Sequence, residues 1–479
     1  MPASASHLHV FLHGTLVGVA VRLRRGAVHL AWDHSSGFAP EDLSQSFHGN
    51  ARGNLDITDW IDGLLPDNPR TRSRWAQDLQ AASAAPFDLL CTRAGLECAG
   101  AVQFHPQPAL PDAQQGTLVH LTEDEVAHLL RTVIPDSGDD ADPLGAPGLG
   151  ELRLSLGGAQ AKMALRRDGA GWHLPTGSLA TTHILKPQSG HRNPGCRESI
   201  AVNEHVCQTA VSAVGVATAS TTLEMFDGEP CIVVDRYDRS SVGAVGDEVG
   251  RLHSEDLCQA LGFASEFKYQ RDGGPTPEAI LRFLRQASDK DDAHEFFLGI
   301  YANWLIGNTD GHSKNYSVLL HEGVARLAPL YDLSSALPYL APGTPPRPAM
   351  RFADGSPDSL AAWSVAAERL RTGVVYDELE SIAKRLPDAL EAAADACPSW
   401  AQLTARDISE QVAARARRVF SESRRSGPAV APVTEPETRP SSAGGSGVCG
   451  VVVGSTGDPC LLYRGHHGRH RSKLPGRKS

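Results

Sequence analysis

The stretch NWLIGNTDGHSKNYSVLL, residues 303–320, leads from an apolar segment through a polar turn into a short apolar segment. The longer run AHEFFLGIYANWLIG, residues 293–307, predicts a helix because it is predominantly apolar and ends at a glycine. The segment YSVLL predicts a strand, which is expected to be buried like the helix. The turn therefore places an aspartate, a histidine, a lysine and an asparagine between two buried segments.

The spacing inside this turn distinguishes two interpretations. Asp, Gly and Asn are common in turns, so the turn alone favours a purely structural loop. However, Asp310 and Asn315 lie five positions apart, which is the spacing of the aspartate and asparagine in a protein-kinase catalytic loop. There the carboxylate takes or orients the proton of an acceptor hydroxyl, and the amide oxygen helps to hold Mg²⁺. His312 and Lys314 lie between them, and Lys314 is a candidate for neutralising charge on the transferred phosphoryl group.

A predicted hairpin brings a second acidic residue to the same region. YSVLL, a turn at residues 321–323 and VARLAPLYD predict two paired strands. Asp332 closes the second strand, where it is positioned to be the main Mg²⁺ ligand. Two acidic groups at the two ends of one hairpin, together with an asparagine at kinase spacing, favour a catalytic site over a structural loop.

A glycine turn precedes this region by about 150 residues. ELRLSLGGAQAKMAL, residues 151–165, reads as a strand, the pair Gly157-Gly158 and a second strand. Glycine lets backbone N–H groups approach phosphate oxygens, since it lacks a Cβ. The Walker A and dinucleotide motifs are absent, and such a glycine pair is more often simply a hairpin turn.

A lysine on a strand and a glutamate on a helix follow the glycine turn. THILKP, residues 182–187, carries Lys186, and the predicted helix at residues 197–216 carries Glu204 beside its apolar stripe. A glycine-rich turn, a strand lysine and a helix glutamate, in this order, match the protein-kinase layout. In that layout the lysine binds the α- and β-phosphates, and the glutamate orients the lysine.

The next strand predicts the connection between two lobes. PCIVVDRYDR, residues 230–239, is apolar through CIVV and then turns abruptly polar. In a kinase-like fold the chain crosses between lobes here and offers backbone groups to adenine. Without the neighbouring motifs, the same pattern reads as a strand that ends at the surface.

Composition and charge exclude several classes of protein. The chain has 479 residues, of which 41% are hydrophobic, but it has no run of about 18 apolar residues, so no membrane span is expected. The beginning MPASASHLHVFLHG lacks the layout of a signal peptide, so a cytoplasmic location is expected. Nine dispersed cysteines without a CxxC pair predict reduced thiols in core positions. The net charge of −11 argues against direct nucleic-acid binding.

Turns, helix caps and linker-like segments along the chain predict its domain organisation. Residues 7–32 predict an opening hairpin with a turn at His13-Gly14, and Thr122 with Glu125 predicts a capping box before a helix. The predicted divisions are an N-terminal subdomain at 1–134, a linker at 135–150, a nucleotide-binding lobe at 151–240, a helical lobe with the catalytic loop at 241–425, and a disordered tail at 426–479.

The chain resembles the HipA-type serine/threonine kinase toxins, the kinase half of bacterial HipBA toxin–antitoxin modules. The resemblance covers roughly residues 8–420 and depends on many motifs in one order. They are FHGN, LLPDNP, FDLL, GAVQF, SLGGAQAKMAL, THILKP, VNEHVC, VVDRYDR, SEDLCQALG, KYQRDGGP, WLIGNTDGHSKN and LAPLYDLSSA. It implies an α+β fold like that of protein kinases, with two lobes, an extra N-terminal β-rich subdomain and a mostly helical C-terminal lobe.

The resemblance also implies roles for individual residues. Asp310 resembles the catalytic aspartate, and Asn315 and Asp332 resemble the Mg²⁺ ligands. Lys186 resembles the phosphate-binding lysine. The other residues expected to contact ATP are Ser155, Leu156, Gly157, Gly158, Ala159, Gln160, Lys162, Glu204, Asp235, Tyr237 and His312. Ser155 falls at the family's autophosphorylation position, where a phosphate of about −1.5 to −2 charge is expected to repel the nucleotide.

Cofactors, substrate and partners follow from the resemblance as well. ATP and Mg²⁺ are the expected cofactors, and a serine of an aminoacyl-tRNA synthetase, most often the glutamyl enzyme, is the expected target. A helix-turn-helix antitoxin similar to HipB, and through it operator DNA, are the expected partners. The alternatives are a small-molecule kinase of the same fold and a non-catalytic corepressor, although the presence of Lys186, Asp310, Asn315 and Asp332 favours activity.

Overall fold

The N-terminal sheet grows from the predicted opening hairpin. Strands β1 (His7–Leu12) and β2 (Thr15–Arg22) pair antiparallel. Between them His13 and Gly14 have φ of 48° and 78°, which confirms the turn. The sheet order is β4-β3-β2-β1-β5, with β3 (Val28–Trp32), β4 (Asn54–Asp56) and β5 (Val102–His105). Helices α1 (Pro40–Leu43), α2 (Thr58–Gly63), α3 (Pro69–Asp78) and α4 (Pro86–Leu90) complete this part.

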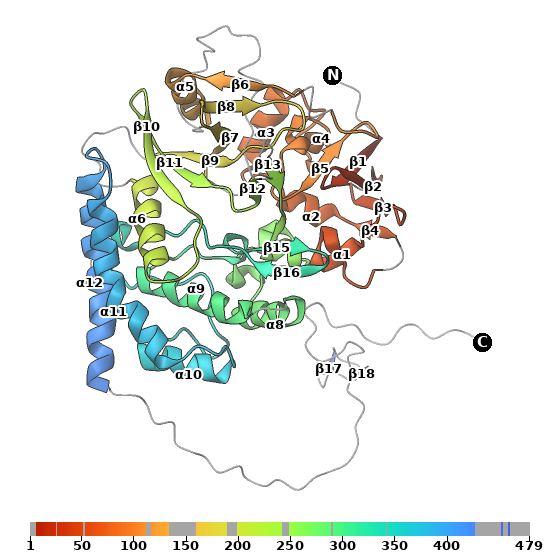
Figure 1. Ribbon diagram of the computed structural model, residues 1–479. Coiled ribbons are helices and arrows are strands. Elements are labelled where there is room, and N and C mark those ends of the chain that lie inside the picture. The colour runs from red at the N-terminus through yellow and green to blue at the C-terminus, as the bar shows by residue number, and fades with distance from the viewer. Residues whose placement is uncertain are drawn as a thin grey trace. The chain divides into compact units, whose positions relative to one another are not determined.

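A second, six-stranded sheet lies next to the first one (Figure 1). Its order is β10-β11-β9-β7-β8-β6. The strands are β6 (Leu118–Leu121), β7 (Met163–Asp168), β8 (Gly171–Pro175), β9 (His183–Pro187), β10 (Thr221–Phe226) and β11 (Glu229–Asp235). Because β6 pairs with β8, this sheet uses residues from before and after the predicted linker.

Two helices pack on the six-stranded sheet. Helix α5 (Glu123–Val133) begins at the predicted capping box, which is confirmed because the Thr122 N–H and hydroxyl both donate to Glu125 Oε2. Its buried Val126 belongs to one apolar cluster with strand residues. Helix α6 (Ile200–Ala213) contributes Ala201 to a separate cluster with strand residue Ile232.

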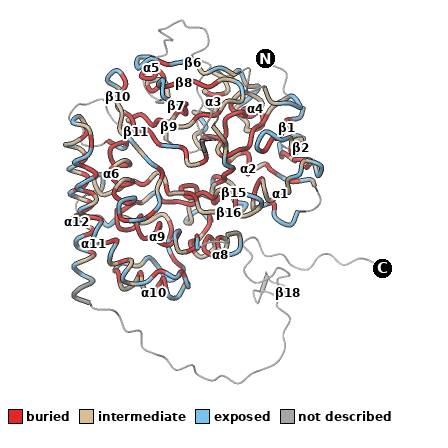
Figure 2. Tube along the Cα trace, viewed as in Figure 1, coloured by how far each residue is buried: buried red, intermediate tan, exposed pale blue. Residues whose placement is uncertain are grey.

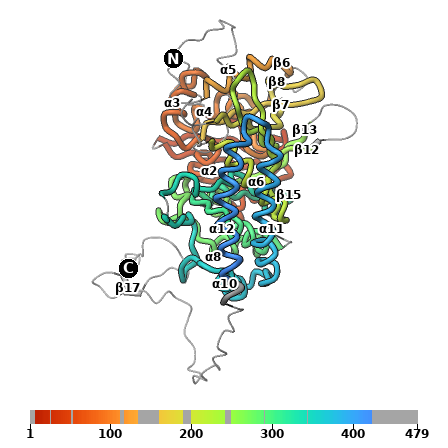
Figure 3. Tube along the Cα trace, turned by 90° about the vertical axis from the view of Figure 1, so that its left-hand side faces the viewer, coloured from red at the N-terminus to blue at the C-terminus, as the bar shows by residue number. Residues whose placement is uncertain are grey.

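The part after residue 250 is mainly helical, as the sequence predicted. Its helices are α7 (Leu257–Ala260), α8 (Pro277–Ala287), α9 (Asp292–Ile306), α10 (Leu360–Arg369), α11 (Tyr376–Asp395) and α12 (Gln402–Ser426). Figure 3 shows α11 and α12 side by side. The small sheets contain β12 (Arg239–Ser241) with β13 (Val249–Arg251), and β14 (His253–Asp256) with β15 (Ser317–His321) and β16 (Val324–Leu327).

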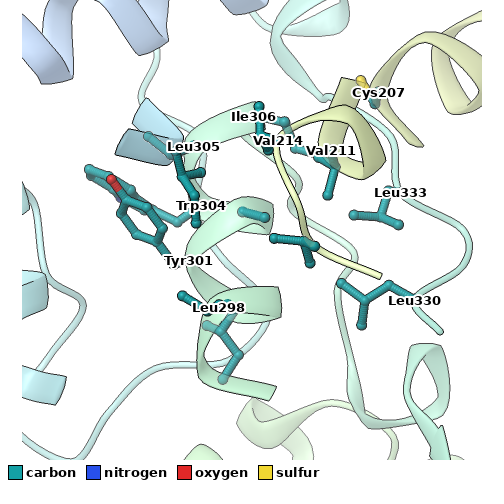
Figure 4. Packing of buried hydrophobic residues seen from close by; sticks show 14 of the residues in the cluster. Cys207, Val211, Val214, Leu298, Tyr301, Trp304, Leu305, Ile306, Leu330 and Leu333 are labelled. Atoms are coloured by element: carbon teal, nitrogen blue, oxygen red, sulfur yellow. The ribbon is translucent and has the colours of Figure 1, made fainter. Parts of the chain in front are cut away.

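Helix α9 forms the centre of the largest apolar cluster. Almost every residue of α9 is buried, which explains why its sequence is apolar on all sides (Figure 2). Tyr301, Trp304 and Leu305 lie in this cluster together with Val211 of α6 (Figure 4). Gly307 ends the helix with φ of 73°, a left-handed conformation that glycine adopts at low cost. The predicted helix and the β15–β16 hairpin that follows the polar turn are thus confirmed.

A buried network of charges joins the N-terminal part to the end of the second sheet. Glu97 Oε1 accepts from Arg236 Nη1 at 2.7 Å and from Arg239 Nη2 at 2.8 Å, while its Oε2 accepts from Arg251. Arg236 also donates two hydrogen bonds to Asp238, at 2.9 and 2.8 Å. The side chains of all five residues are nearly inaccessible to solvent. Since Glu97 precedes β5 and Arg236 follows β11, the network fixes one sheet to the other.

The computed structural model describes residues 6–24, 26–50, 53–111, 116–133, 160–188, 199–241, 249–288, 291–341, 343–426, 452–453 and 458–459. One unit comprises Met1–Pro428 and a second Ala429–Ser479. In the second unit the described residues are β17 (Val452–Val453) and β18 (Asp458–Pro459), which pair antiparallel. The predicted linker at 135–150 lies outside the described residues, and the predicted domain borders and disordered tail stay predictions.

Two findings bear on the predictions from composition. The six described cysteines are all free, and all but Cys91 are buried, as expected for thiols in core positions. Among the helices that the structure describes, none combines the length and the apolar composition needed to span a bilayer.

Candidate active site

One cavity of about 670 Å³ collects the predicted site residues that the structure describes. The second sheet, the polar turn after α9 and the segment after β16 all line it. The predicted residues that line it are Gln160, Lys162, Lys186, Glu204, Asp235, Tyr237, Asp310, His312, Asn315 and Asp332. The remaining ones, Ser155, Leu156, Gly157, Gly158 and Ala159, lie outside the described residues. Residues from three distant parts of the chain therefore converge on one cavity.

Lys186 lies at the centre of an ion-pair cluster. It projects from β9, and its Nζ donates to Glu204 Oε1 of α6 at 2.7 Å and to Asp332 Oδ1 at 2.9 Å. Burial disfavours the ammonium, but the carboxylates of Asp332 and Glu204 outweigh burial and raise the pKa of Lys186. The lysine is thus held charged, with its ammonium between the two carboxylates.

Asp332 combines exposure to the cavity with a strained backbone. Its side chain is 35% exposed, and burial opposes its charge, but Lys186 and Lys162 lower the pKa of Asp332 to about 2. Its φ is 61°, a left-handed value that is uncommon for residues other than glycine and that clusters at functional sites. The carboxylate is therefore ionised at neutral pH and held in a fixed position.

The polar turn after α9 is fixed by its own hydrogen bonds. The Asp310 N–H donates to Asn308 Oδ1 at 2.8 Å, and Asn315 Nδ2 donates to the Asp310 carbonyl at 3.2 Å. The carboxylate of Asp310 remains exposed, and its Oδ1 accepts a hydrogen bond of 2.5 Å from the Tyr269 hydroxyl. Because Asn315 uses its N–H₂ group inside the turn, its oxygen stays available to a ligand.

Lys314 has a different position from the one expected for charge neutralisation. Its Nζ donates to Asp67 Oδ1 at 2.7 Å, and Lys268 donates to the other oxygen of Asp67, also at 2.7 Å. Burial opposes the charge of Asp67, but Lys314 and Lys268 lower the pKa of Asp67 to about 2. Lys314 therefore connects the catalytic turn to the N-terminal part, because Asp67 lies between α2 and α3.

The end of β11 offers a flat slot. The ring of Tyr237 stacks on that of Tyr331, with centroids 5.6 Å apart and planes at 21°. Val234 and Ile184 add apolar surface to the cavity, and Asp235 pairs with His183 at 3.1 Å. Burial raises the pKa of Tyr237 to about 12, so its hydroxyl stays protonated. An apolar slot beside a strand edge is suited to a planar heterocycle.

Lys162 follows the predicted glycine turn and reaches the same cavity. Burial, together with the neighbouring ammonium of Lys186, lowers the pKa of Lys162 to about 8. Lys162 and Lys186 thus place two ammonium groups in one region of the cavity, beside Asp332. Such a region suits the phosphates of a nucleotide.

The residues present fit Mg²⁺ bound together with a phosphorylated ligand. Asp332 and Asn315 offer a carboxylate and an amide oxygen, and Mg²⁺ typically takes one or two carboxylates while substrate phosphates and water complete its shell. The structure describes no cluster of three or more His, Cys, Asp or Glu side chains that could hold a metal by itself. The buried Nδ1 of His312, which has no hydrogen-bond partner within the described residues, also suits a site that takes a polar ligand.

Three residues of this site escaped prediction from the sequence. Asp67, Lys268 and Tyr269 line the cavity and bond to the catalytic turn. Lys268 and Tyr269 open the motif KYQRDGGP, and Asp67 lies in LLPDNP, so the motifs were visible. Their contacts with the turn could not be predicted, since no local sequence pattern links residues so far apart in the chain.

Comparison with known proteins assigns the chain to a family. The model of the HipA N-terminal domain matches residues 8–105, and the model of the HipA-like C-terminal domain matches residues 154–397. Y4mE of Sinorhizobium fredii, named as a candidate kinase, is 32% identical over 436 residues, which cover 86% of this chain and 98% of Y4mE. The serine/threonine-protein kinase toxin HipA of Shewanella oneidensis is 27% identical over 76% of this chain and 83% of that protein.

A solved structure supports the fold. The Shewanella oneidensis HipA in the complex of HipA, HipB and operator DNA matches with a TM-score of 0.69 and 24% identity, over 86% of this chain and 97% of that chain. This likeness confirms the predicted kinase-like α+β fold. With both domain models matched in order, the chain belongs to the HipA family of serine/threonine protein kinases.

Proposed function

We propose that this protein transfers the γ-phosphoryl group of ATP, with Mg²⁺, to a serine or threonine of another protein. The observation that carries the proposal is the convergence of Lys186, Glu204, Asp310 and Asp332 on one cavity. The pair Lys186–Glu204 is closed, as an active kinase requires of its lysine and glutamate, and Lys186 also pairs with Asp332.

Each group has a chemical task in this proposal. Lys186 and Lys162 bind phosphate oxygens, and the slot beside Asp235 and Tyr237 takes adenine. His312, Gln160 and the glycine turn at 155–159 complete the contacts with the nucleotide. Asn315 and Asp332 would hold Mg²⁺, which neutralises charge on the β- and γ-phosphates when bound. Asp310 accepts the proton of the acceptor hydroxyl, since its carboxylate is exposed to the cavity.

The substrate and the partners are proposed from the relatives. The Shewanella oneidensis relative is named a toxin, and its solved complex contains HipB and operator DNA. We therefore propose that this chain is the toxin of a similar module and binds a helix-turn-helix antitoxin, which in turn binds operator DNA. The proposed target is a serine of an aminoacyl-tRNA synthetase, most often the glutamyl enzyme, and its modification would inhibit translation in the cytoplasm. Ser155 is the proposed autophosphorylation site.

The experiment that tests this function uses γ-labelled ATP and a bacterial cell lysate. With Mg²⁺ present, the purified protein is expected to label a protein band that contains phosphoserine or phosphothreonine. EDTA should abolish the labelling, and excess Mg²⁺ should restore it. The reason is that Asn315 and Asp332 are proposed to act on the phosphates through a bound Mg²⁺. Label that appears only in a small molecule would instead identify a small-molecule kinase of the same fold.

The pKa of Lys162 predicts how ATP binding depends on pH. At pH 7 the ammonium is mostly charged, and above its pKa of about 8 it loses the proton that attracts phosphate. The Kd for ATP is therefore expected to rise as the pH increases from 8 to 9, by up to roughly tenfold, the limit for a single group. Lys162→Met should bind ATP weakly at every pH and show no such rise. A rise of equal size in this variant would contradict the assignment.

A further inference from the structure

Tyr269 occupies one carboxylate oxygen of Asp310, the residue proposed to take the proton of the acceptor hydroxyl. Its hydroxyl donates to Asp310 Oδ1 at 2.5 Å, and its ring lies edge-on to His312 with centroids 4.8 Å apart. The guanidinium of Arg271 covers the ring at 4.7 Å from the centroid. Burial and the bond to Asp310 both raise the pKa of Tyr269, so the phenol is a neutral donor and not a base. Its hydroxyl thus makes the contact expected of a serine or threonine hydroxyl.

A second cavity of about 560 Å³ reaches the same tyrosine from another part of the molecule. Asp67, Lys268 and Tyr269 line both this cavity and the one that holds Lys186 and Asp332. The second cavity is also lined by Arg72 and Ser73 of α3 and by Ser265, Glu266, Arg271 and Asp272. Tyr269 therefore separates the predicted nucleotide cavity from a space between the N-terminal part and the helical part.

We infer that the second cavity receives the acceptor segment of a protein substrate, whose serine or threonine hydroxyl displaces the Tyr269 hydroxyl from Asp310. The inference rests on the proposed function and adds to it the place where the substrate enters. A kinase needs two sites that meet at one carboxylate, and Tyr269 is where the two cavities meet. An acceptor hydroxyl at this place would replace the hydrogen bond that Tyr269 donates to Asp310.

The phosphoryl-transfer step involves no chemical change at Tyr269. The acceptor oxygen forms a bond to the γ-phosphorus, and the bond from that phosphorus to the bridging oxygen of ADP breaks. The acceptor proton passes to Asp310 and then to solvent. Tyr269 loses no proton, so its hydroxyl can return to Asp310 after the phosphorylated segment leaves.

The walls of the second cavity suit a polypeptide. Arg72 donates to Asp62 and Lys268 donates to Asp67, so these two cations are already neutralised by carboxylates. Ser73 is exposed and Arg271 is 77% exposed, which leaves polar groups at the opening. A wall of paired charges and hydroxyl groups favours hydrogen bonds with a peptide backbone over binding of a small anion.

Two variants test the inference, with purified glutamyl-tRNA synthetase as acceptor. Tyr269→Phe keeps the ring but removes the competing hydroxyl, so the KM for the acceptor is expected to fall roughly tenfold. ATP hydrolysis without acceptor should increase, because water gains access to Asp310. Ser73→Trp places a large ring in the second cavity and should raise the KM for the acceptor roughly tenfold more than the KM for ATP. Gln77→Trp, on the same helix but outside the lining of either cavity, is the matched control.

The outcomes distinguish failure of this inference from failure of the proposed function on which it rests. If the wild-type protein transfers no phosphate to any protein, the proposed function fails, and the inference fails with it. If the wild type is active but Ser73→Trp raises the acceptor KM no more than Gln77→Trp does, only the acceptor site is wrong. A Tyr269→Phe variant with lower kcat and unchanged acceptor KM would show that Tyr269 merely supports the turn, and would also overturn the inference.

Discussion

Asp310→Asn is expected to lower kcat for phosphoryl transfer to protein by about 10²–10⁴-fold, the usual contribution of a general base. Asparagine has nearly the same shape and still offers an oxygen to the Tyr269 hydroxyl, so the turn should keep its conformation. What the variant loses is the ability to take the acceptor proton. Initial rates with γ-labelled ATP, measured for both proteins at saturating ATP, give the ratio directly.

Two controls show whether the loss is chemical. The thermal unfolding midpoint should be unchanged, because Asp310 is exposed and its main-chain N–H still donates to Asn308. The Kd for ATP should also stay within a factor of about two, since the nucleotide contacts Lys186 and the slot beside Tyr237 in the proposed site. A variant that keeps a third or more of the wild-type kcat would rule out Asp310 as the base.

Glu97→Gln is expected to lower the free energy of unfolding of the Met1–Pro428 unit by about 3–5 kcal/mol, the cost of breaking a buried ion pair on one side. The carboxylate faces the guanidinium groups of Arg236, Arg239 and Arg251. An amide removes the negative charge and turns N–H₂ toward some of these donors. Arg236 and Arg239 would then still pair with Asp238, but Arg251 would lose the carboxylate that it pairs with. Urea denaturation at pH 7, followed by tryptophan fluorescence, measures the effect.

The effect of pH provides a second test of the same group. Burial opposes the charge of Glu97, but the three arginines lower its pKa to about 2, from an ordinary value near 4.5. A carboxyl with a lowered pKa stabilises the fold fully above its unfolded pKa and loses this effect as the pH falls toward the folded pKa. The difference in free energy of unfolding between wild type and Glu97→Gln should therefore decrease as the pH falls from about 4.5 to 2.

An exposed ion pair is the matched control for Glu97. Asp395 pairs with Arg406 at 3.1 Å, but both side chains are more than half exposed. Asp395→Asn should change the free energy of unfolding by less than about 1 kcal/mol. If Glu97→Gln were equally mild at pH 7, the buried network would not hold the two sheets together.

Local patterns were enough to predict much of the fold and of the catalytic turn. The apolar run of α9, the glycine that ends it and the β15–β16 hairpin all depend on residues close in sequence. The strand position of Lys186 and the helix position of Glu204 could be predicted for the same reason. Their contact was predicted only because the order of motifs implied a known arrangement of strand and helix.

The remaining contacts depend on tertiary structure, which local patterns do not encode. Lys314 was expected to face a phosphoryl group, but it pairs with Asp67 because folding brings α2 and α3 against the catalytic turn. Tyr269 carried no signal as a partner of Asp310. Likewise β6 lies before the predicted linker, yet it completes the second sheet. Each of these contacts joins segments that are far apart in the chain, so no periodic pattern of residues could predict it.

The bond between Asp67 and Lys314 also has a consequence for synthesis. The two residues are 247 positions apart, and Lys314 emerges from the ribosome roughly 12–50 seconds after Asp67 at ordinary elongation rates. During that time the N-terminal sheet can fold before the carboxylate of Asp67 can pair with Lys314. The catalytic turn can close onto Asp67 only once translation has passed residue 314. A growing chain that is interrupted before this point cannot assemble the active site, so the kinase cannot become active until residue 314 has been translated.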